Sequence, residues 1–222
     1  ISVLMAAYNV APYLRDAVGS ILHQTFPDFE LIIVDDGSTD NTPHILRELA
    51  SRDSRLRIIT RPNGGAAQAR NDGLSHCRGE FVAIMDGDDI SFPYRFEKQL
   101  KYMRQHRDCV CLGTGWRYLH DDKLSTGPHR LFCDHGRIAK QFLLGYGAAV
   151  LHSTAMVRRK AMLGIGGYRD HLKNSNEDTD LLIRLEEVGR LANISDVCFL
   201  YRRRPGSNTA TMEGRPGVAE AL

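Results

Sequence analysis

The sequence predicts an α/β fold in which a mostly parallel central sheet is flanked by helices. Through the first 90 residues, short apolar runs alternate with segments whose apolar residues recur at helical spacing. This strand–helix order favours parallel strands with helices on both faces of the sheet. The chain has 222 residues, of which 42% are hydrophobic and 25% charged, enough for a buried core without disulfides.

The first half contains four expected strands with helices between them. An apolar run over 1–6 predicts a buried strand. After Pro12, a residue common in the first helical turn, Leu14, Val18 and Ile21 recur on one helix face. The elements that follow are strand 30–34, a helix that Asp40 or Thr42 can cap, strand 56–60, helix 66–77 and strand 80–85.

The second half has a looser rhythm. Phe96, Leu100 and Met103 at positions i, i+4 and i+7 predict a helix after Pro93. The later elements are strand 110–119, a polar turn over 121–128, helix 138–144, strand 154–157, a helix marked by Leu181, Leu182 and Leu185, and strand 197–201. Since neither a repeat nor a linker interrupts this order, we expect one domain over 1–222. It has halves 1–90 and 91–205, and we expect a mobile tail over 206–222.

The charge balance and the cysteines exclude several classes of protein. Lys and Arg total 29 against 27 Asp and Glu, a net charge of +2, which is a small excess for a dedicated nucleic-acid binder. No apolar run approaches the roughly 20 residues of a membrane span, and no signal peptide is visible. The five cysteines fit no zinc or thioredoxin spacing, so we expect reduced thiols and a cytoplasmic location. Because the chain begins inside an apolar run without Met, we expect an excised domain.

Carboxylates follow two of the expected strands. Asp35 and Asp36 end strand 30–34, and Asp86, Asp88 and Asp89 follow strand 80–85. Ligands of such sheets bind beyond the carboxyl ends of the strands, where these residues meet. Crowded carboxylates repel each other unless a cation or hydrogen-bond donors offset the repulsion, and Mg²⁺ or Mn²⁺ suits oxygen ligands. The sequence therefore predicts a divalent-metal site at this edge, although Asp-Gly pairs also occur as ordinary turns.

Several common catalytic motifs are absent. The segment after the first strand, Y-N-V-A over 8–11, is not the G-x-G-x-x-G of dinucleotide-binding folds. The chain also contains no G-x-x-x-x-G-K-[ST], no G-x-S-x-G and no H-E-x-x-H motif. These absences argue against dinucleotide oxidoreductases, P-loop enzymes, serine hydrolases and zinc proteases.

An ordered set of motifs resembles family 2 glycosyltransferases across almost the whole chain. They include V-D-D-G-S-T-D over 34–40, N-G-G over 63–65, M-D-G-D-D over 85–89 and N-E-D-T-D-L over 176–181. The resemblance implies a GT-A fold and the transfer of a sugar, with inversion, from a nucleotide diphosphate to an acceptor hydroxyl. The Q-x-x-R-W signature of processive relatives is absent, because the only Trp is Trp116. We therefore expect the addition of single sugars.

The resemblance also assigns roles to individual residues. It gives Asp178 as the general base and Asp88 as the ligand of Mn²⁺ or Mg²⁺. It places the nucleotide sugar, with uridine as the favoured base, in the half 1–90, on Ala6, Ala7, Tyr8, Asp35, Asp36, Arg70 and Asp86. Ala6 departs from the Pro or Thr that is frequent in the family.

Four further residues are candidates for acceptor or secondary contacts. Glu177 can orient the acceptor or a neighbouring donor. His152 can contact acceptor or donor, or it can have a structural role. Trp116 can stack on a sugar ring, but a position in the core is favoured for it. Arg204 stands where many relatives carry His, and it can bind phosphate but cannot ligate a metal. The half 91–205 would thus carry the acceptor side and the catalytic base.

Two other functions stay open on the sequence. A nucleotidyltransferase would share the sheet but usually has a Gly-rich basic loop after its first strand. A sugar-nucleotide-binding module without turnover would be expected to lack Asp88 or Asp178, and both are present. The expected partners are a nucleotide sugar and a carbohydrate or glycolipid acceptor, without nucleic acid. Peripheral contact with the inner face of the cytoplasmic membrane and the oligomeric state are left open.

Overall fold

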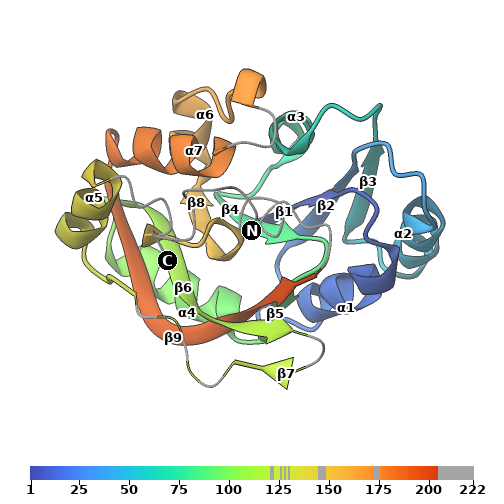
Figure 1. The fold of residues 1–222 in the computed structure, drawn as a ribbon, viewed down its shortest axis with the longest axis horizontal. Coiled ribbons are helices and arrows are strands. Elements are labelled where there is room, and N and C mark those ends of the chain that lie inside the picture. The colour runs from blue at the N-terminus through green and yellow to red at the C-terminus, as the bar shows by residue number, and fades with distance from the viewer. Residues whose placement is uncertain are drawn as a thin grey trace, which may run out of the picture.

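The computed structural model describes residues 1–120, 123–125, 127, 129, 131–144, 149–172 and 176–204 (Figure 1). The expected mobile tail over 206–222 and part of the polar turn over 121–128 lie outside these residues. The strands are β1 (Ser2–Ala7), β2 (Glu30–Asp35), β3 (Leu56–Thr60), β4 (Phe81–Asp86), β5 (Ile90–Ser91), β6 (Cys109–His120), β7 (Lys123–Leu124), β8 (Met156–Arg158) and β9 (Arg190–Arg203). The α-helices are α1 (Ala11–Leu22), α2 (Thr42–Arg52), α3 (Ala66–His76), α4 (Arg95–Gln105), α5 (His135–Leu143), α6 (Arg159–Gly164) and α7 (Glu177–Glu186).

One sheet runs through the molecule in the order β3-β2-β1-β4-β8-β6-β9-β5, with β7 paired to β6. Strands β1 to β4 are parallel to one another, as the strand–helix alternation predicts. The register pairs Ala6 of β1 with Val34 on one side and with Asp86 on the other. The carboxyl ends of β2 and β4 therefore lie at the same edge of the sheet, on either side of β1.

Alternate side chains of the strands point to two different cores. Val3 and Met5 pack in the core beneath α1, α2 and α4, whereas Leu4 between them packs with α3, α6 and α7 on the opposite face. This period of two along a strand is what places one helical layer on each face of a sheet. Figure 1 shows α3, α6 and α7 together on one side of the sheet and α1 on the other.

The second half departs from the expectations mainly in the length of its elements. Strand β9 begins at Arg190 rather than near 197, and its pairing with β6 contains a register shift at Thr114/Gly115. The polar Ser195 and Asp196 at this irregularity interrupt the apolar pattern, which hides the first part of the strand. Helix α5 begins at His135, three residues before the expected 138, because Asp134 caps it by accepting from the Arg137 N–H.

A buried arginine supports the sheet where its strands diverge. Arg95 on α4 is fully buried, and its guanidinium donates to the carbonyl oxygens of Ile84 (2.9 Å) and Ala155 (3.3 Å). Gln99, one turn later, donates to the carbonyl oxygen of Leu112 (2.7 Å). These contacts give side-chain donors to buried carbonyl oxygens of β4 and β6, while the Ala155 carbonyl oxygen also accepts from the Ile84 N–H at 2.8 Å. They also fix the end of β4, where the acidic residues of the site begin.

Candidate active site at the carboxyl edge of the sheet

A cavity of about 270 Å³ opens at the carboxyl ends of β1 and β4. The loops after β2 and β3, helix α3 and the end of β9 complete its walls. The structure thus brings together most of the predicted donor and metal residues, and Arg204 lies beside Asp88. The lining residues used below are Ala6, Ala7, Tyr8, Asp36, Arg70, Asp86, Asp88, Arg202 and Arg204.

An aromatic ring stands at the mouth of the cavity. Tyr8 follows β1 directly and is 48% exposed, so its side chain is accessible to a planar ligand. The next residue, Asn9, has a φ of 50°, a left-handed conformation that Asn tolerates better than most residues. Its side-chain oxygen accepts from the Thr39 N–H at 2.8 Å, which holds the loop after β1 against the loop after β2.

The buried carboxylate of Asp36 organises the loop after β3. It accepts from Arg61 Nη1 at 2.7 Å, from the Gly64 N–H at 3.0 Å and from the Gly65 N–H at 2.8 Å. The neighbouring Asp35 accepts from the Ser38 N–H at 3.1 Å, and its other oxygen is buried without a hydrogen-bond partner. Sequence reasoning missed Arg61, although the N-G-G motif already marked the loop that carries it.

Strand β9 brings two arginines to the acidic segment after β4. Arg204 Nε donates to Asp88 Oδ2 at 2.5 Å. Arg202 donates through its backbone N–H to Asp89 Oδ1 at 2.8 Å and through Nε to the Asp88 carbonyl oxygen at 2.9 Å. Both guanidinium groups also lie over the ring of Tyr13. Arg203, between them, lies instead over the ring of Tyr118.

The acidic residues of this segment repel each other. Burial, and then the charge of Asp86, raise the pKa of Asp88, and Arg204 offsets only part of this rise. Burial, followed by the charges of Asp88 and Asp86, raises the pKa of Asp89 well above its usual range. The Oδ2 atom of Asp89 is buried without a hydrogen-bond partner. The carboxylates of this segment therefore disfavour one another's charge, and an additional cation would offset this repulsion.

Arg70 on α3 joins this segment to the start of α7. Its Nη2 donates to Asp86 Oδ1 at 2.9 Å and its Nη1 donates to Glu177 Oε1 at 3.0 Å. Burial alone would raise the pKa of Asp86, but Arg70 and weaker contributions from its neighbours bring it below the ordinary value. For Glu177, burial outweighs Arg70 and the pKa is raised. Arg70 is thus placed at the cavity as predicted, with two carboxylates as its partners.

The first turn of α7 carries the predicted base. Helix α7 begins at Glu177 after Asn176, whose φ of 59° is left-handed, so the chain turns sharply into the helix. Asp178 is partly exposed, and its Oδ1 accepts from the Thr179 N–H at 2.7 Å. A carboxylate at this position is favoured by the helix dipole. Asp178 does not line the cavity itself, but its neighbour Glu177 is tied to the cavity wall through Arg70.

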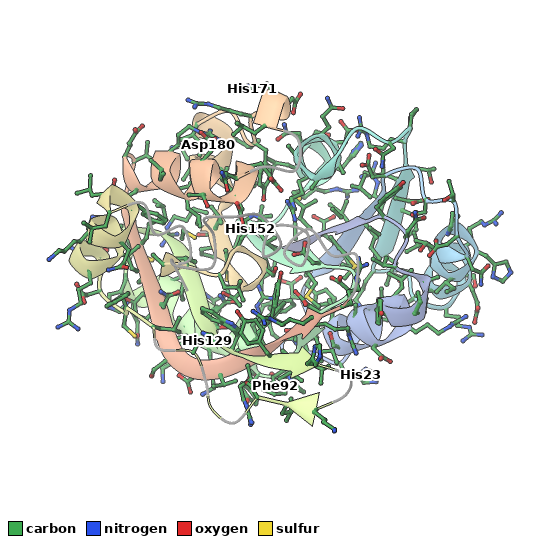
Figure 2. The ribbon with its side chains drawn as sticks, in the orientation of Figure 1. His23, Phe92, His129, His152, His171 and Asp180 are labelled. Carbon is green, nitrogen blue, oxygen red and sulfur yellow. The ribbon has the colours of Figure 1, made fainter. Side chains whose placement is uncertain are left out.

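Two of the expected acceptor residues are buried. His152 is 5% exposed, and its Nε2 lies 2.8 Å from the hydroxyl of Tyr168. Figure 2 labels His152 near the middle of the view and Asp180 on α7. Trp116 is also 5% exposed and stacks on His129 with 5.0 Å between ring centroids. Neither lines the cavity, and both lie in the interior.

The carboxylate oxygens at the cavity are suitable ligands for a hard divalent cation. Among the described residues, no three His, Cys, Asp or Glu side chains gather into a complete metal site. Asp88 supplies a carboxylate at the cavity wall, and Asp86, close by, is already bonded to Arg70 and Ser153. Mg²⁺ and Mn²⁺ sites of this type use one or two protein carboxylates and take their other ligands from phosphate and water. The repulsion among Asp86, Asp88 and Asp89 agrees with such an ion.

Comparison with known proteins decides the family. The model of the family described as "Glycosyl transferase family 2" matches residues 2–165. The chain belongs to glycosyl transferase family 2. The O-antigen biosynthesis glycosyltransferase WbnJ of Escherichia coli is 32% identical to this chain over 206 residues, which are 91% of this chain and 79% of WbnJ. The predicted resemblance is thereby confirmed, and the chain is a glycosyltransferase.

Solved structures confirm the predicted GT-A fold of this family 2 member. The S. aureus TarS structure with UDP-GlcNAc superposes with a TM-score of 0.77 at 22% identity, over 95% of this chain and 60% of that chain. The mannosyltransferase PcManGT of Pyrobaculum calidifontis, in complex with GDP-Man and Mn²⁺, gives a TM-score of 0.73 at 20% identity. It is matched over 95% of this chain and 59% of its own length. The chain therefore spans about three fifths of both solved chains.

In the part of the chain that the structure describes, no helix is both long and apolar enough to cross a bilayer.

Proposed function

We propose that this glycosyltransferase moves a sugar, with inversion, from a nucleotide diphosphate to an acceptor hydroxyl, with a divalent cation at Asp88 and Asp178 as the general base. One observation carries the proposal. A single buried guanidinium, that of Arg70, holds both Asp86 beside Asp88 and Glu177 beside Asp178. The two segments that carry the proposed metal ligand and the proposed base are thus held together through Arg70, which suits a reaction whose leaving group and nucleophile meet at one carbon.

The donor would lie in the cavity with its base at Tyr8. The exposed ring of Tyr8 can stack on a flat base, and Asp36 retains lone pairs that can accept from a ring N–H. Ala6 and Ala7 leave room for the nucleoside at the end of β1. The TarS structure contains UDP-GlcNAc and the PcManGT structure contains GDP-Man, which supports a nucleotide-sugar donor for this chain. Uridine is the base that we propose.

The diphosphate would face Asp88 and the arginines of β9. Asp88 would hold Mn²⁺ or Mg²⁺ together with oxygens of the donor, and the Mn²⁺ in the PcManGT complex supports this assignment. When bound, the ion would supply Lewis acidity that stabilises charge on the leaving diphosphate. Arg202 and Arg204 line the same wall and would add positive charge toward the phosphates.

Asp178 would accept the proton of the acceptor hydroxyl. As that oxygen attacks the anomeric carbon, the bond from this carbon to the diphosphate oxygen breaks and its electron pair leaves with the diphosphate. A single displacement on the face opposite the leaving group inverts the anomeric centre. General-base help of this kind contributes about 10²–10⁴ in rate. The transition state resembles an oxocarbenium ion, as in glycoside chemistry.

The wider role that we propose is single-sugar addition in the synthesis of a cell-envelope polysaccharide or glycoconjugate. The name of WbnJ, an O-antigen biosynthesis glycosyltransferase, supports this role. The acceptor would be a carbohydrate or glycolipid at the cytoplasmic face of the membrane. Within one catalytic domain, the half 1–90 would bind the donor and the half 91–205 would carry the acceptor site.

A panel of nucleotide sugars tests the proposal. Thermal unfolding is measured with each donor in the presence of Mn²⁺ and again with EDTA, because a ligand of the native state raises the Tm. We expect one nucleotide sugar to raise the Tm only with metal, and to be consumed when acceptor glycans are added. Binding without any turnover would instead indicate a binding module. Release of pyrophosphate from a nucleoside triphosphate and a sugar phosphate would indicate a nucleotidyltransferase.

A further inference from the structure

The carboxylate of Asp86 is held on both of its oxygens. Oδ1 accepts from Arg70 at 2.9 Å, and Oδ2 accepts from the hydroxyl of Ser153 at 2.6 Å. Ser153 is itself buried in the 3₁₀ turn His152–Thr154, so its hydroxyl cannot move away into solvent. Two opposing hydrogen bonds fix the rotation of the Asp86 carboxylate, two residues before Asp88.

A tyrosine covers the same arginine from another side. The Arg70 guanidinium carbon lies 5.6 Å from the centre of the Tyr168 ring, within the range of a cation–π contact. The backbone of Tyr168 is held by the side chain of Asn71, the residue after Arg70. Asn71 accepts from the Tyr168 N–H at 2.9 Å and donates to its carbonyl oxygen at 2.8 Å. The Tyr168 ring therefore keeps its place relative to α3.

The hydroxyl of Tyr168 is anchored by an uncharged histidine. His152 Nε2 and the Tyr168 hydroxyl oxygen are 2.8 Å apart. Burial, and then the charge of Arg70, lower the pKa of His152 to about 4, while burial raises the pKa of Tyr168. Both groups are therefore neutral at physiological pH. They contribute geometry to the Arg70 site without adding charge to it.

We infer that Ser153 and Tyr168 are positioning residues that act through Arg70. Ser153 fixes the carboxylate of Asp86, which accepts from Arg70. Tyr168, anchored by His152, fixes the Arg70 guanidinium that also reaches Glu177. Together they set how the metal-ligand segment after β4 lies relative to the base-bearing turn of α7. This role rests on the proposed function, in which the first segment binds the donor and the second takes the acceptor proton.

Substitutions of Ser153 and Tyr168 should change different constants, the donor Kd for Ser153 and kcat for Tyr168. Ser153→Ala frees one oxygen of Asp86 at the donor wall, so the Kd for the donor with Mn²⁺ should rise about tenfold with a smaller change in kcat. Ser153→Thr keeps the hydroxyl and should restore the Kd. Tyr168→Phe keeps the ring but loses the anchor to His152. It should lower kcat about tenfold and leave the donor Kd within about twofold.

Matched controls remove the same groups elsewhere. Ser75→Ala removes an exposed hydroxyl of α3 that donates to the Asp72 carbonyl oxygen, and Tyr102→Phe removes a hydroxyl on α4, outside the cavity. Both should behave as wild type. A role limited to stability would lower the Tm of Ser153→Ala and Tyr168→Phe while the kcat and Kd of the folded enzyme stayed at wild-type values. That result would overturn the inference.

A spectroscopic measurement tests the positioning role of Ser153 and Tyr168 independently of turnover. In ¹H–¹⁵N spectra of the guanidinium groups, an Arg70 held at both Nη atoms should give separate, slowly exchanging Nη signals in wild type and in both controls. These signals should average together in Ser153→Ala and in Tyr168→Phe. Unchanged Arg70 signals in the two variants would contradict the inference even if the wild type transfers sugar. Absence of donor binding by wild type would count against the proposed function alone.

Discussion

The guanidinium of Arg70 and the carboxylate of Glu177 lie 3.0 Å apart, although 107 positions separate them in the sequence. Both side chains are nearly buried, at 8% and 10% exposure. Removing one partner of a buried pair leaves the other charge uncompensated, which typically costs about 3–5 kcal/mol. The start of α7 is therefore held to the sheet edge by a contact that is costly to break.

Asp178→Asn should separate chemistry from binding. The amide keeps the size of the side chain but cannot take the acceptor proton, so we expect kcat to fall about 10²–10⁴-fold. Donor affinity with Mn²⁺, measured by calorimetry, should stay near the wild-type value because Asp178 does not line the cavity. Glu187→Gln, at the other end of α7, is the matched control and should retain full activity. A normal rate in Asp178→Asn would rule out this base.

Asp88→Ala should remove the metal dependence of nucleotide binding. Without this carboxylate the cation loses its protein ligand, and Arg204 loses the partner that it now contacts at 2.5 Å. In titrations with the nucleoside diphosphate, Mn²⁺ should no longer increase affinity. The control is Asp108→Ala, which removes an exposed carboxylate at the start of β6. If Mn²⁺ still strengthened binding to Asp88→Ala by the wild-type factor, the metal would have to bind elsewhere.

We expect the free energy of unfolding to fall in mild acid because of His152. Burial and the charge of Arg70 lower its pKa from 6.5 to about 4 in the folded protein. Between these two pH values His152 binds a proton in the unfolded chain but stays unprotonated in the folded protein. Stability is therefore lost as the pH falls from about 6.5 toward 4, by up to about 3 kcal/mol.

Urea unfolding across this pH range tests the assignment. His152→Gln keeps a hydrogen-bonding group for Tyr168 but does not titrate, so its stability should change less with pH than that of wild type. His44→Gln, an exposed change on α2, should follow the wild-type curve. If the free energy of unfolding changed equally with pH in His152→Gln and in wild type, other groups would have to cause the loss of stability in acid.

Arg95→Met should destabilise the fold. The substitution removes the side-chain donor of the Ile84 carbonyl oxygen, whereas the Ala155 carbonyl oxygen still accepts from the Ile84 N–H. A buried acceptor without a partner costs about 1–3 kcal/mol, so we expect a loss of about 2 kcal/mol in chemical denaturation. Arg104→Met, on the exposed face of the same helix, should change stability little. Equal stability of the two variants would mean that other groups satisfy these carbonyls.

The first half of the fold was predictable because its signals are local. Strand β3 has the expected bounds and β1, β2 and β4 end within about one residue of theirs, since each is an apolar run that stops at polar residues. Parallel pairing then places Asp36 and Asp86 at one edge without further information. The short strands β5 and β7 were missed, because two residues carry no periodicity.

The partners of the site residues could not be predicted in the same way. Arg70 was expected to contact the donor, but its carboxylate partners lie 16 and 107 positions away. Ser153 reaches Asp86, and Tyr168 reaches Arg70, from segments that have no pattern of their own. Burial also gave His152 and Trp116 interior positions that a single residue type does not disclose. These contacts depend on how α3, β8 and α7 meet, which is a property of the packed molecule.

The alternation of side chains along β9 limits how this chain can change in length. Arg202 and Arg204 point toward Tyr13 and the acidic segment, whereas Arg203 points toward Tyr118. An insertion or deletion of one residue between α7 and Arg202 would exchange these two faces, if the strand kept its pairing with β6. It would turn Arg203 toward the cavity and withdraw its two neighbours. Natural variants of this segment should therefore differ by substitutions or by even-numbered changes in length, and a designed chimera must keep the same parity.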